Sequence, residues 1–157
     1  MSKEPPRVWP AFGEWRTWPA VNEEPFLSEG HGTRNYWASV RANPRARETY
    51  LGLRPGAALD PGSILVEALT DRSKSRPDEL YVMEKLGDRT WRFLVVSVDG
   101  TIDAAAGTAL CQRCHAEAVA DGLFGLPRRV GPDKNNRPDR KDLPGLGVQK
   151  EKTQTRR

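Results

Sequence analysis

Two runs of residues decide the fold, Glu79-Leu-Tyr-Val-Met-Glu-Lys-Leu86 and Thr90-Trp-Arg-Phe-Leu-Val-Val-Ser-Val98. Both are rich in β-branched and aromatic residues, which is typical of strands. The short segment between them begins with Gly87-Asp88, and a Gly-Asp pair between two such runs is typical of a β-hairpin. The sequence therefore predicts two antiparallel strands joined across Gly87-Asp88.

Two earlier segments also predict strands, residues 33–40 and Gly62-Ser-Ile-Leu-Val-Glu-Ala-Leu-Thr70. The first alternates and is rich in Tyr, Trp and Val, and the second is an apolar run that contains one charge, Glu67. Between them, Asn43-Pro44 predicts a helix over residues 44–51, because proline is favoured in the first helical turn.

The two ends of the chain differ in composition. Residues 1–10 are rich in proline, and we expect them to be loose. Residues 12–18 carry aromatic side chains three positions apart and predict a short helix whose Trp15 and Trp18 pack into the core. Residues 128–157 combine many charges with repeated Pro and Gly, so we expect a disordered or draped tail.

Residues 111–115, Cys111-Gln-Arg-Cys-His115, form a C-x-x-C-H motif, which is the attachment pattern of a c-type haem. The two thiols add across the haem vinyl groups, and the adjacent imidazole becomes the iron's proximal ligand. Residues three and four apart share one face of a helix. We therefore expect a haem-binding helix over residues 103–120, on which Cys111, Cys114 and His115 face one haem.

Three alternatives compete for the same motif. A thioredoxin-like redox pair also uses C-x-x-C, but it follows a buried strand early in a βαβ unit, which this motif does not. A structural zinc would need Cys111, Cys114, His115 and His31, although adjacent ligands are awkward in a tetrahedral site. A disulfide across so short a gap would be strained.

His31 is the only other histidine and lies between two glycines in residues 22–32, which we expect to be a loop. Its glycine neighbours favour a surface or hinge histidine. The alternative is that His31 is a second axial ligand of the haem.

The length of 157 residues suits one domain, and no apolar run is long enough to span a membrane. Haem attachment of this kind occurs on the exported side of a bacterial membrane, so we expect a periplasmic protein. The first residues lack the apolar core of a signal peptide. We therefore expect that a native leader was removed and that Met1 is not native.

The net charge of +4 is unevenly distributed. Residues 128–157 contain ten Lys or Arg and four Asp or Glu, a net charge of +6, which leaves −2 for residues 1–127. A nucleic-acid surface would need basic and aromatic residues interleaved on folded elements, and this basic segment has no aromatic residue. We expect no nucleic-acid partner.

The chain resembles the cytochrome P-460 family, which includes the beta-type cytochromes c-prime. The matching stretches span about residues 11–127, and they are Thr33-Arg-Asn-Tyr36, Asp60-Pro-Gly-Ser-Ile-Leu-Val-Glu67, Tyr81-Val-Met-Glu-Lys85, Thr90-Trp-Arg-Phe93, Cys111-Gln-Arg-Cys-His115, Asp121 and Phe124. The resemblance implies an α+β fold, an antiparallel sheet domain with peripheral helices and the motif on a late helix. It also implies one pentacoordinate haem c and a homodimer.

The resemblance directs attention to two further residues. Hydroxylamine-oxidising members carry a lysine cross-linked to the haem, and Glu67 stands at its position, so the same cross-link is not expected. Glu67 is therefore either solvated at a strand end or directed at the haem, and the resemblance favours the haem. Arg34 matches a distal arginine of the family, where it would pair with a propionate, a bound anion or Glu67.

Together these observations predict a mono-haem c-type cytochrome with an open distal site. It would bind small gases or nitrogen oxides and exchange electrons with a partner protein. The alternative is an enzyme that oxidises hydroxylamine or reduces peroxide, with Glu67 as acid or base. A zinc- or thiol-based cytosolic protein is a weaker third hypothesis.

Overall fold

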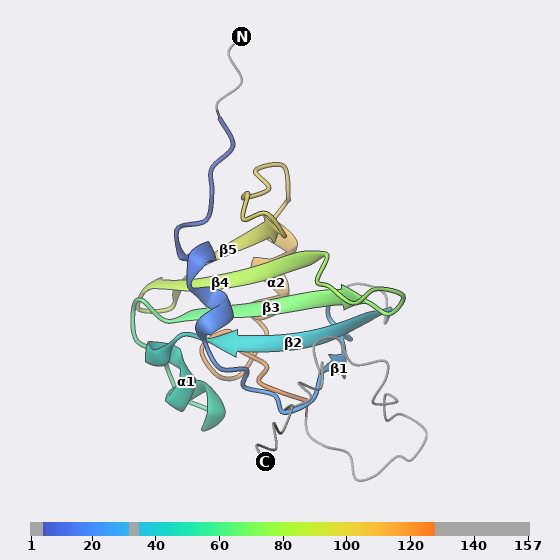
Figure 1. Cartoon of the computed structure of the whole chain (residues 1–157). Coiled ribbons are helices and arrows are strands. Elements are labelled where there is room, and N and C mark those ends of the chain that lie inside the picture. The colour runs from blue at the N-terminus through green and yellow to red at the C-terminus, as the bar shows by residue number, and fades with distance from the viewer. Residues whose placement is uncertain (1–4, 32–34, 128–157) are drawn as a thin grey trace, which may run out of the picture.

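The computed structural model describes residues 5–31 and 35–127, so Arg34 and residues 128–157 lie outside the described residues. Five antiparallel strands form one sheet in the order β1-β2-β3-β4-β5 (Figure 1). Their bounds are Phe26–Leu27 for β1, Tyr36–Ala42 for β2, Ile64–Asp71 for β3, Glu79–Gly87 for β4 and Thr90–Ser97 for β5. The prediction of an α+β fold with an antiparallel sheet is confirmed, including the β4–β5 hairpin.

Peripheral helices flank the sheet: the 3₁₀ helices η1 (Pro10–Gly13) and η2 (Trp15–Thr17), and the α-helices α1 (Pro44–Leu51) and α2 (Ala109–His115). The bounds of α1 are those predicted. Its N-terminus is capped by Asn43, whose Oδ1 accepts a hydrogen bond from the Ala46 amide at 3.1 Å. The expected loop at residues 22–32 contributes the short edge strand β1.

The helix expected over residues 103–120 is much shorter than predicted, because α2 begins only at Ala109. Asp103 instead forms a turn, in which its Oδ1 accepts a hydrogen bond from the Ala105 amide at 2.9 Å. Such side-chain bonds compete with helical pairing, and Gly107 adds a further helix-weakening residue. The motif Cys111–His115 nevertheless lies on the helix that remains.

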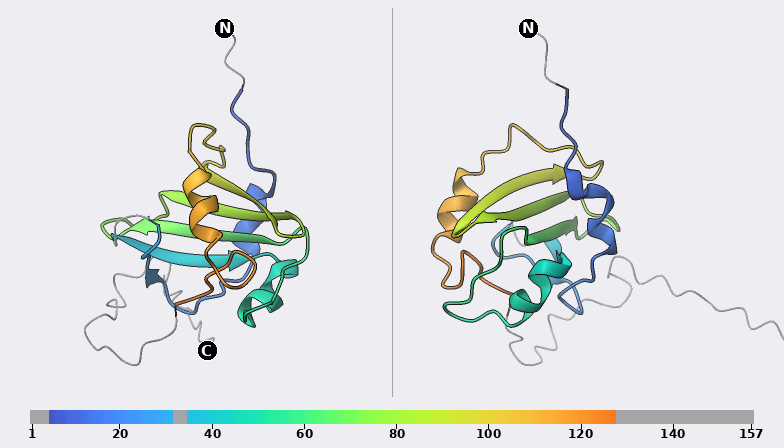
Figure 2. Two further views of the ribbon diagram at one scale, coloured as in Figure 1. Left: turned by 180° about the vertical axis from the view of Figure 1, so that it is seen from behind. Right: turned by 90° about the vertical axis from the view of Figure 1, so that its left-hand side faces the viewer.

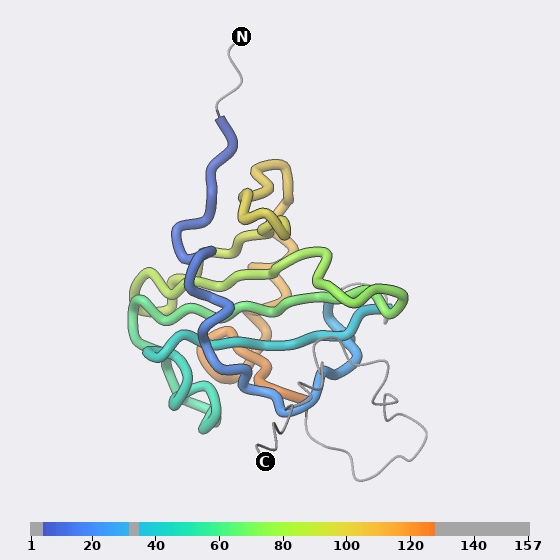
Figure 3. Tube along the Cα trace, viewed as in Figure 1, coloured from blue at the N-terminus to red at the C-terminus, as the bar shows by residue number. Residues whose placement is uncertain are grey.

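The N-terminal segment and α2 lie on opposite sides of the sheet (Figure 2). The N-terminal segment crosses one face of the strands, as the blue part of the tube shows (Figure 3). Trp9, Trp15 and Trp18 are buried there against alternate strand residues, which are Ile64, Val66, Ala68, Leu80, Val82, Leu94 and Val96. We call this layer the tryptophan face.

The expectation that all of residues 1–10 are loose is wrong at Trp9. Its side chain has no exposed surface, and its Nε1 donates a 2.7 Å hydrogen bond to Oε1 of Glu84. Its amide also donates to the carbonyl of Gly100 at 2.8 Å. The high proline content of the segment gave no sign that Trp9 anchors it to the sheet. The core positions predicted for Trp15 and Trp18 are confirmed.

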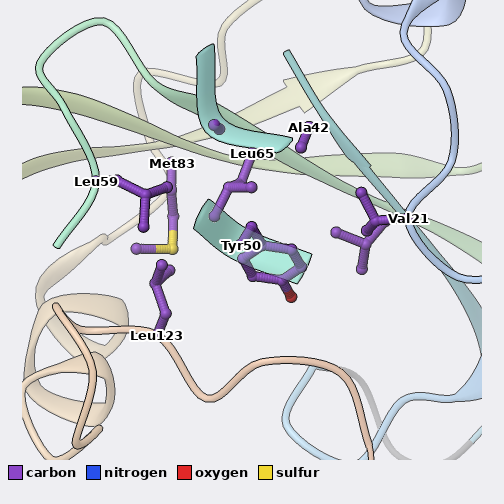
Figure 4. Close-up of a cluster of buried hydrophobic side chains, with 9 residues drawn as sticks. Val21, Ala42, Tyr50, Leu59, Leu65, Met83 and Leu123 are labelled. Carbon is purple, nitrogen blue, oxygen red and sulfur yellow. The ribbon is translucent and has the colours of Figure 1, made fainter. Parts of the chain in front are cut away.

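The opposite face of the sheet carries a second apolar cluster, in which Tyr50 of α1 packs with Val21, Leu65, Met83 and Leu123 (Figure 4). α1 and the segment that follows α2 cover only part of this face. Next to the cluster the face is hollow, and we call it the cavity face. Within the described residues, no helix has the length and apolar character needed to cross a membrane.

Candidate functional site

A cavity of about 600 Å³ lies on the cavity face. Strands β3, β4 and β5 form its floor, α2 and residues 123–127 form one wall, and residues 26–31 form another. Most of its lining is apolar or aromatic and includes Phe26, Leu65, Met83, Phe93, Leu123 and Phe124. The volume is within the range of about 300–1,000 Å³ that is common for cofactor sites.

The motif on α2 contributes Cys111, Cys114 and His115 to the lining of this cavity. Both cysteines are free thiols, and Cys114 is exposed while Cys111 is partly buried. Burial raises the pKa of the Cys111 thiol. The helical spacing therefore brings the three side chains to one cavity, as their positions in the sequence predicted.

The ring of His115 is held by a backbone carbonyl. Its Nδ1 donates a 2.7 Å hydrogen bond to the carbonyl oxygen of Gly122, which leaves Nε2 as the nitrogen with a lone pair. Burial lowers the pKa of His115, which favours the neutral imidazole. A neutral ring with an anchored Nδ1–H is the form in which histidine binds a metal.

The loop that offers this carbonyl is fixed by a buried ion pair. Nζ of Lys85 lies 2.5 Å from Oδ1 of Asp121, and the two side chains are 2% and 4% exposed. Oδ2 of Asp121 accepts from the Leu59 amide at 2.9 Å, and its carbonyl accepts from Nε1 of Trp91 at 2.8 Å. The pair lies directly beside Gly122 and thus positions His115.

Sequence reasoning missed this ion pair. Lys85 lies on the same face of β4 as Tyr81 and Met83, because side chains two apart on a strand point the same way. A lysine at an inward position of an apolar strand was the available signal. Its partner, 36 positions later in the chain, could not be identified from that pattern.

Glu67 lies on β3 opposite Val40 of β2 and Tyr81 of β4, and all three line the cavity. The two positions considered for Glu67 were a solvated strand end and one directed at the haem. In the structure, the Glu67 side chain is directed into the cavity. Its Oε1 accepts a 3.4 Å hydrogen bond from Oγ of Ser28, and its Oε2 lies 2.9 Å from Nδ1 of His31. The pairing expected with Arg34 lies outside the described residues.

The expectation that His31 is a surface or hinge residue is wrong, because its ring lines the cavity. The ring stacks on Tyr81 at a centroid distance of 4.6 Å, and its centroid is 6.2 Å from that of His115. The hydrogen bond to Glu67 raises the pKa of His31 against the opposing effect of burial.

Backbone contacts explain the position of His31. The His31 amide donates to Oγ of Ser28 at 3.1 Å, and the Ser28 amide donates to the Tyr36 carbonyl at 3.0 Å. These bonds fold the segment back along the edge of the sheet. The glycines beside His31 suggested mobility, and no pattern in the sequence indicated this docking.

The cavity fits a covalently attached haem on three grounds: its volume, its mainly apolar lining, and two free thiols next to an anchored imidazole. Cys111 and Cys114 would hold the porphyrin edge, and His115 would ligate the iron. Within residues 5–31 and 35–127, the cavity included, no three His, Cys, Asp or Glu side chains are grouped so as to hold a metal ion by themselves.

No model of a known protein family matches the chain, and no curated protein matches it either.

Proposed function

We propose that this protein is a mono-haem c-type cytochrome that binds small gases or nitrogen oxides in the cavity and exchanges electrons with a partner protein. The observation that carries the proposal is that Cys111, Cys114 and His115 line one cavity while Nδ1 of His115 is bonded to a backbone carbonyl. The resemblance to the cytochrome P-460 family adds to this support.

When bound, haem supplies a one-electron redox couple and a coordination position for a small ligand. The chain's own residues determine how that position is used. Phe93 and Phe124 flank the His115 ring, with centroids 5.2 and 5.5 Å from it, and restrict its rotation. Most of the cavity lining is apolar, so charge interactions inside the cavity are screened less than they are in bulk water.

A second candidate function is a haem enzyme that oxidises hydroxylamine or reduces peroxide. The observation that favours it is the contact between Glu67 and His31 inside the cavity. This pair can hold a proton on Nδ1 of His31 or on the carboxylate, as a general acid or base must. In the resemblance to the cytochrome P-460 family, Glu67 takes the position of the lysine that hydroxylamine-oxidising members cross-link to the haem. The enzyme proposed here would therefore lack that cross-link.

We further propose that the protein works as a homodimer on the exported side of the membrane. Both expectations come from the resemblance to the cytochrome P-460 family and from the site at which c-type haem is attached. Sedimentation of the haem-loaded protein should give twice the monomer mass, and an apolar leader upstream in the genomic reading frame would support export.

The test of the proposed function is covalent haem. Protein expressed with a c-type haem maturation system should gain the mass of one haem and keep its haem stain after denaturation. Cys111→Ala and Cys114→Ala should each leave one thioether and shift the pyridine haemochrome spectrum. Gln112→Ala is the matched control, because Gln112 is exposed on the same helix and should retain normal haem.

A denatured chain with the mass of the bare polypeptide would overturn the proposal. If haem is present, steady-state assays with hydroxylamine and with peroxide distinguish the two candidates. Turnover that is lost in Glu67→Gln would favour the enzyme, and the absence of turnover with intact gas binding would favour the cytochrome.

A further inference from the structure

We propose that His31 is the second axial ligand of the haem iron, opposite His115, so that the resting protein is six-coordinate. This inference rests on the proposed function, because it needs the haem at Cys111 and Cys114. It replaces the open distal site with one that a residue of the chain occupies.

The separation of the two imidazole rings carries the inference. Their centroids are 6.2 Å apart and their planes differ by 18°. A ligating imidazole nitrogen lies about 2 Å from its metal and the ring centre about 1 Å further, so two rings on opposite sides of one metal have centroids about 6 Å apart. A histidine that only donates a hydrogen bond to a bound gas would need a larger separation.

The hydrogen bonds of the two rings also match this role. Nδ1 of His31 is engaged by Glu67 at 2.9 Å, and Nδ1 of His115 is engaged by the Gly122 carbonyl at 2.7 Å. Neither Nε2 forms a hydrogen bond with a residue that the structure describes. In the neutral form, each ring can therefore keep Nδ1–H as donor and present the Nε2 lone pair to the iron.

The His31 ring is fixed on the sheet by contacts that would hold it in place as a ligand. It stacks on Tyr81, whose plane differs from its own by 5°, and Glu67 binds it from the neighbouring strand. Ser28 bonds both the His31 amide and the Glu67 carboxylate. A carboxylate bonded to Nδ1 also increases the basicity of the ligating nitrogen.

Met83 is the competing soft ligand in the cavity lining. Its side chain is only 9% exposed and packs among Leu59 and Leu123 in the apolar cluster (Figure 4). Met83 thus already has an apolar packing role on α1's side of the cavity face. Leucine has a similar volume, so Met83→Leu removes the sulfur with little change in packing.

The function that follows is controlled access to the iron. An external ligand must first displace His31, so gas binding becomes slow and weak compared with an open site. Electron exchange needs no change of ligand and is favoured. Glu67 would act as a positioning residue, because its carboxylate contacts His31, the proposed ligand.

The test uses the ferric haem-loaded protein in optical and electron paramagnetic resonance spectra. The parent should be low-spin. His31→Ala should lose the low-spin signal and become high-spin, and free imidazole added to this variant should restore it. Met83→Leu is the control and should remain low-spin. Mass spectrometry of each sample confirms that haem is attached, so a folding defect is not mistaken for a loss of ligation.

Attached haem with a high-spin parent spectrum would overturn this inference and leave the proposed function standing. A low-spin state that persists in His31→Ala, or that is lost in Met83→Leu, would also overturn it. The absence of attached haem would instead overturn the proposed function, and this inference with it.

Discussion

The two faces of the sheet differ in how completely they are packed. On the tryptophan face, Trp9, Trp15 and Trp18 fill the space above the strands, and every one of them is at most 6% exposed. On the cavity face, the same strands leave about 600 Å³ unfilled and place Glu67 and His31 in contact there. Stability and function are therefore separated by strand alternation, since neighbouring residues of β3 and β4 serve different faces.

This separation makes a general expectation testable. Substitutions on the tryptophan face should cost stability and leave the proposed haem site intact, and substitutions on the cavity face should cost less stability and change the properties of that site. The ion pair of Lys85 and Asp121 is the intermediate case, because it is fully buried and yet positions His115 through Gly122.

The largest loss of stability is expected for Trp9→Ala. Truncation removes a fully buried ring and leaves Glu84 without its indole donor, so the free energy of unfolding should fall by about 4 kcal/mol. Urea denaturation measures this loss. Haem content and spin state should match the parent, and altered ligation would contradict the separation of the faces.

A somewhat smaller loss is expected for Asp121→Ala, which leaves Lys85 buried and unpaired. The expected cost is about 3 kcal/mol, as for other broken buried ion pairs. Because the same change frees the loop that binds His115, resonances of the His115 ring in NMR spectra should also shift. The double variant Lys85→Met/Asp121→Ala should recover part of the stability, and no recovery would show that the loop, not the charge, is responsible.

Leu65→Ala should cost about 2 kcal/mol, at the lower end of the range for buried leucines, because its side chain borders an existing cavity. Leu80→Ala is the like-for-like control on the tryptophan face, where the leucine is 1% exposed and fully surrounded. Equal costs for the two variants would indicate that the cavity face is as tightly packed as the tryptophan face.

The smallest effect on stability is expected for Glu67→Gln, below about 1 kcal/mol, because Glu67 and His31 are still 20% and 25% exposed and glutamine keeps an acceptor for Nδ1. Haem attachment should be intact. The affinity for a gaseous ligand, or its pH dependence, should change several-fold because the charge beside His31 is gone. Identical ligand binding in parent and variant would remove Glu67 from the functional site.

The elements that the sequence predicted well depend on local patterns. The β4–β5 hairpin follows from its two β-rich runs and the Gly87-Asp88 turn, and α1 follows from Asn43-Pro44. The motif Cys111–His115 needs only helical spacing to bring its side chains to one cavity. Even here the predicted length of α2 was wrong, since the hydrogen bond that the Asp103 side chain accepts from the Ala105 amide competes with helical pairing.

The sequence alone predicted the four longer strands, α1 and the helical spacing of the motif, because these depend on neighbours within a few positions. Only the tertiary structure decided what faces the motif. His31 and Glu67 are 36 positions apart, as are Lys85 and Asp121, and Trp9 reaches Glu84 across 75 positions. Contacts at such separations arise from strand register and chain reversal, which no local pattern encodes.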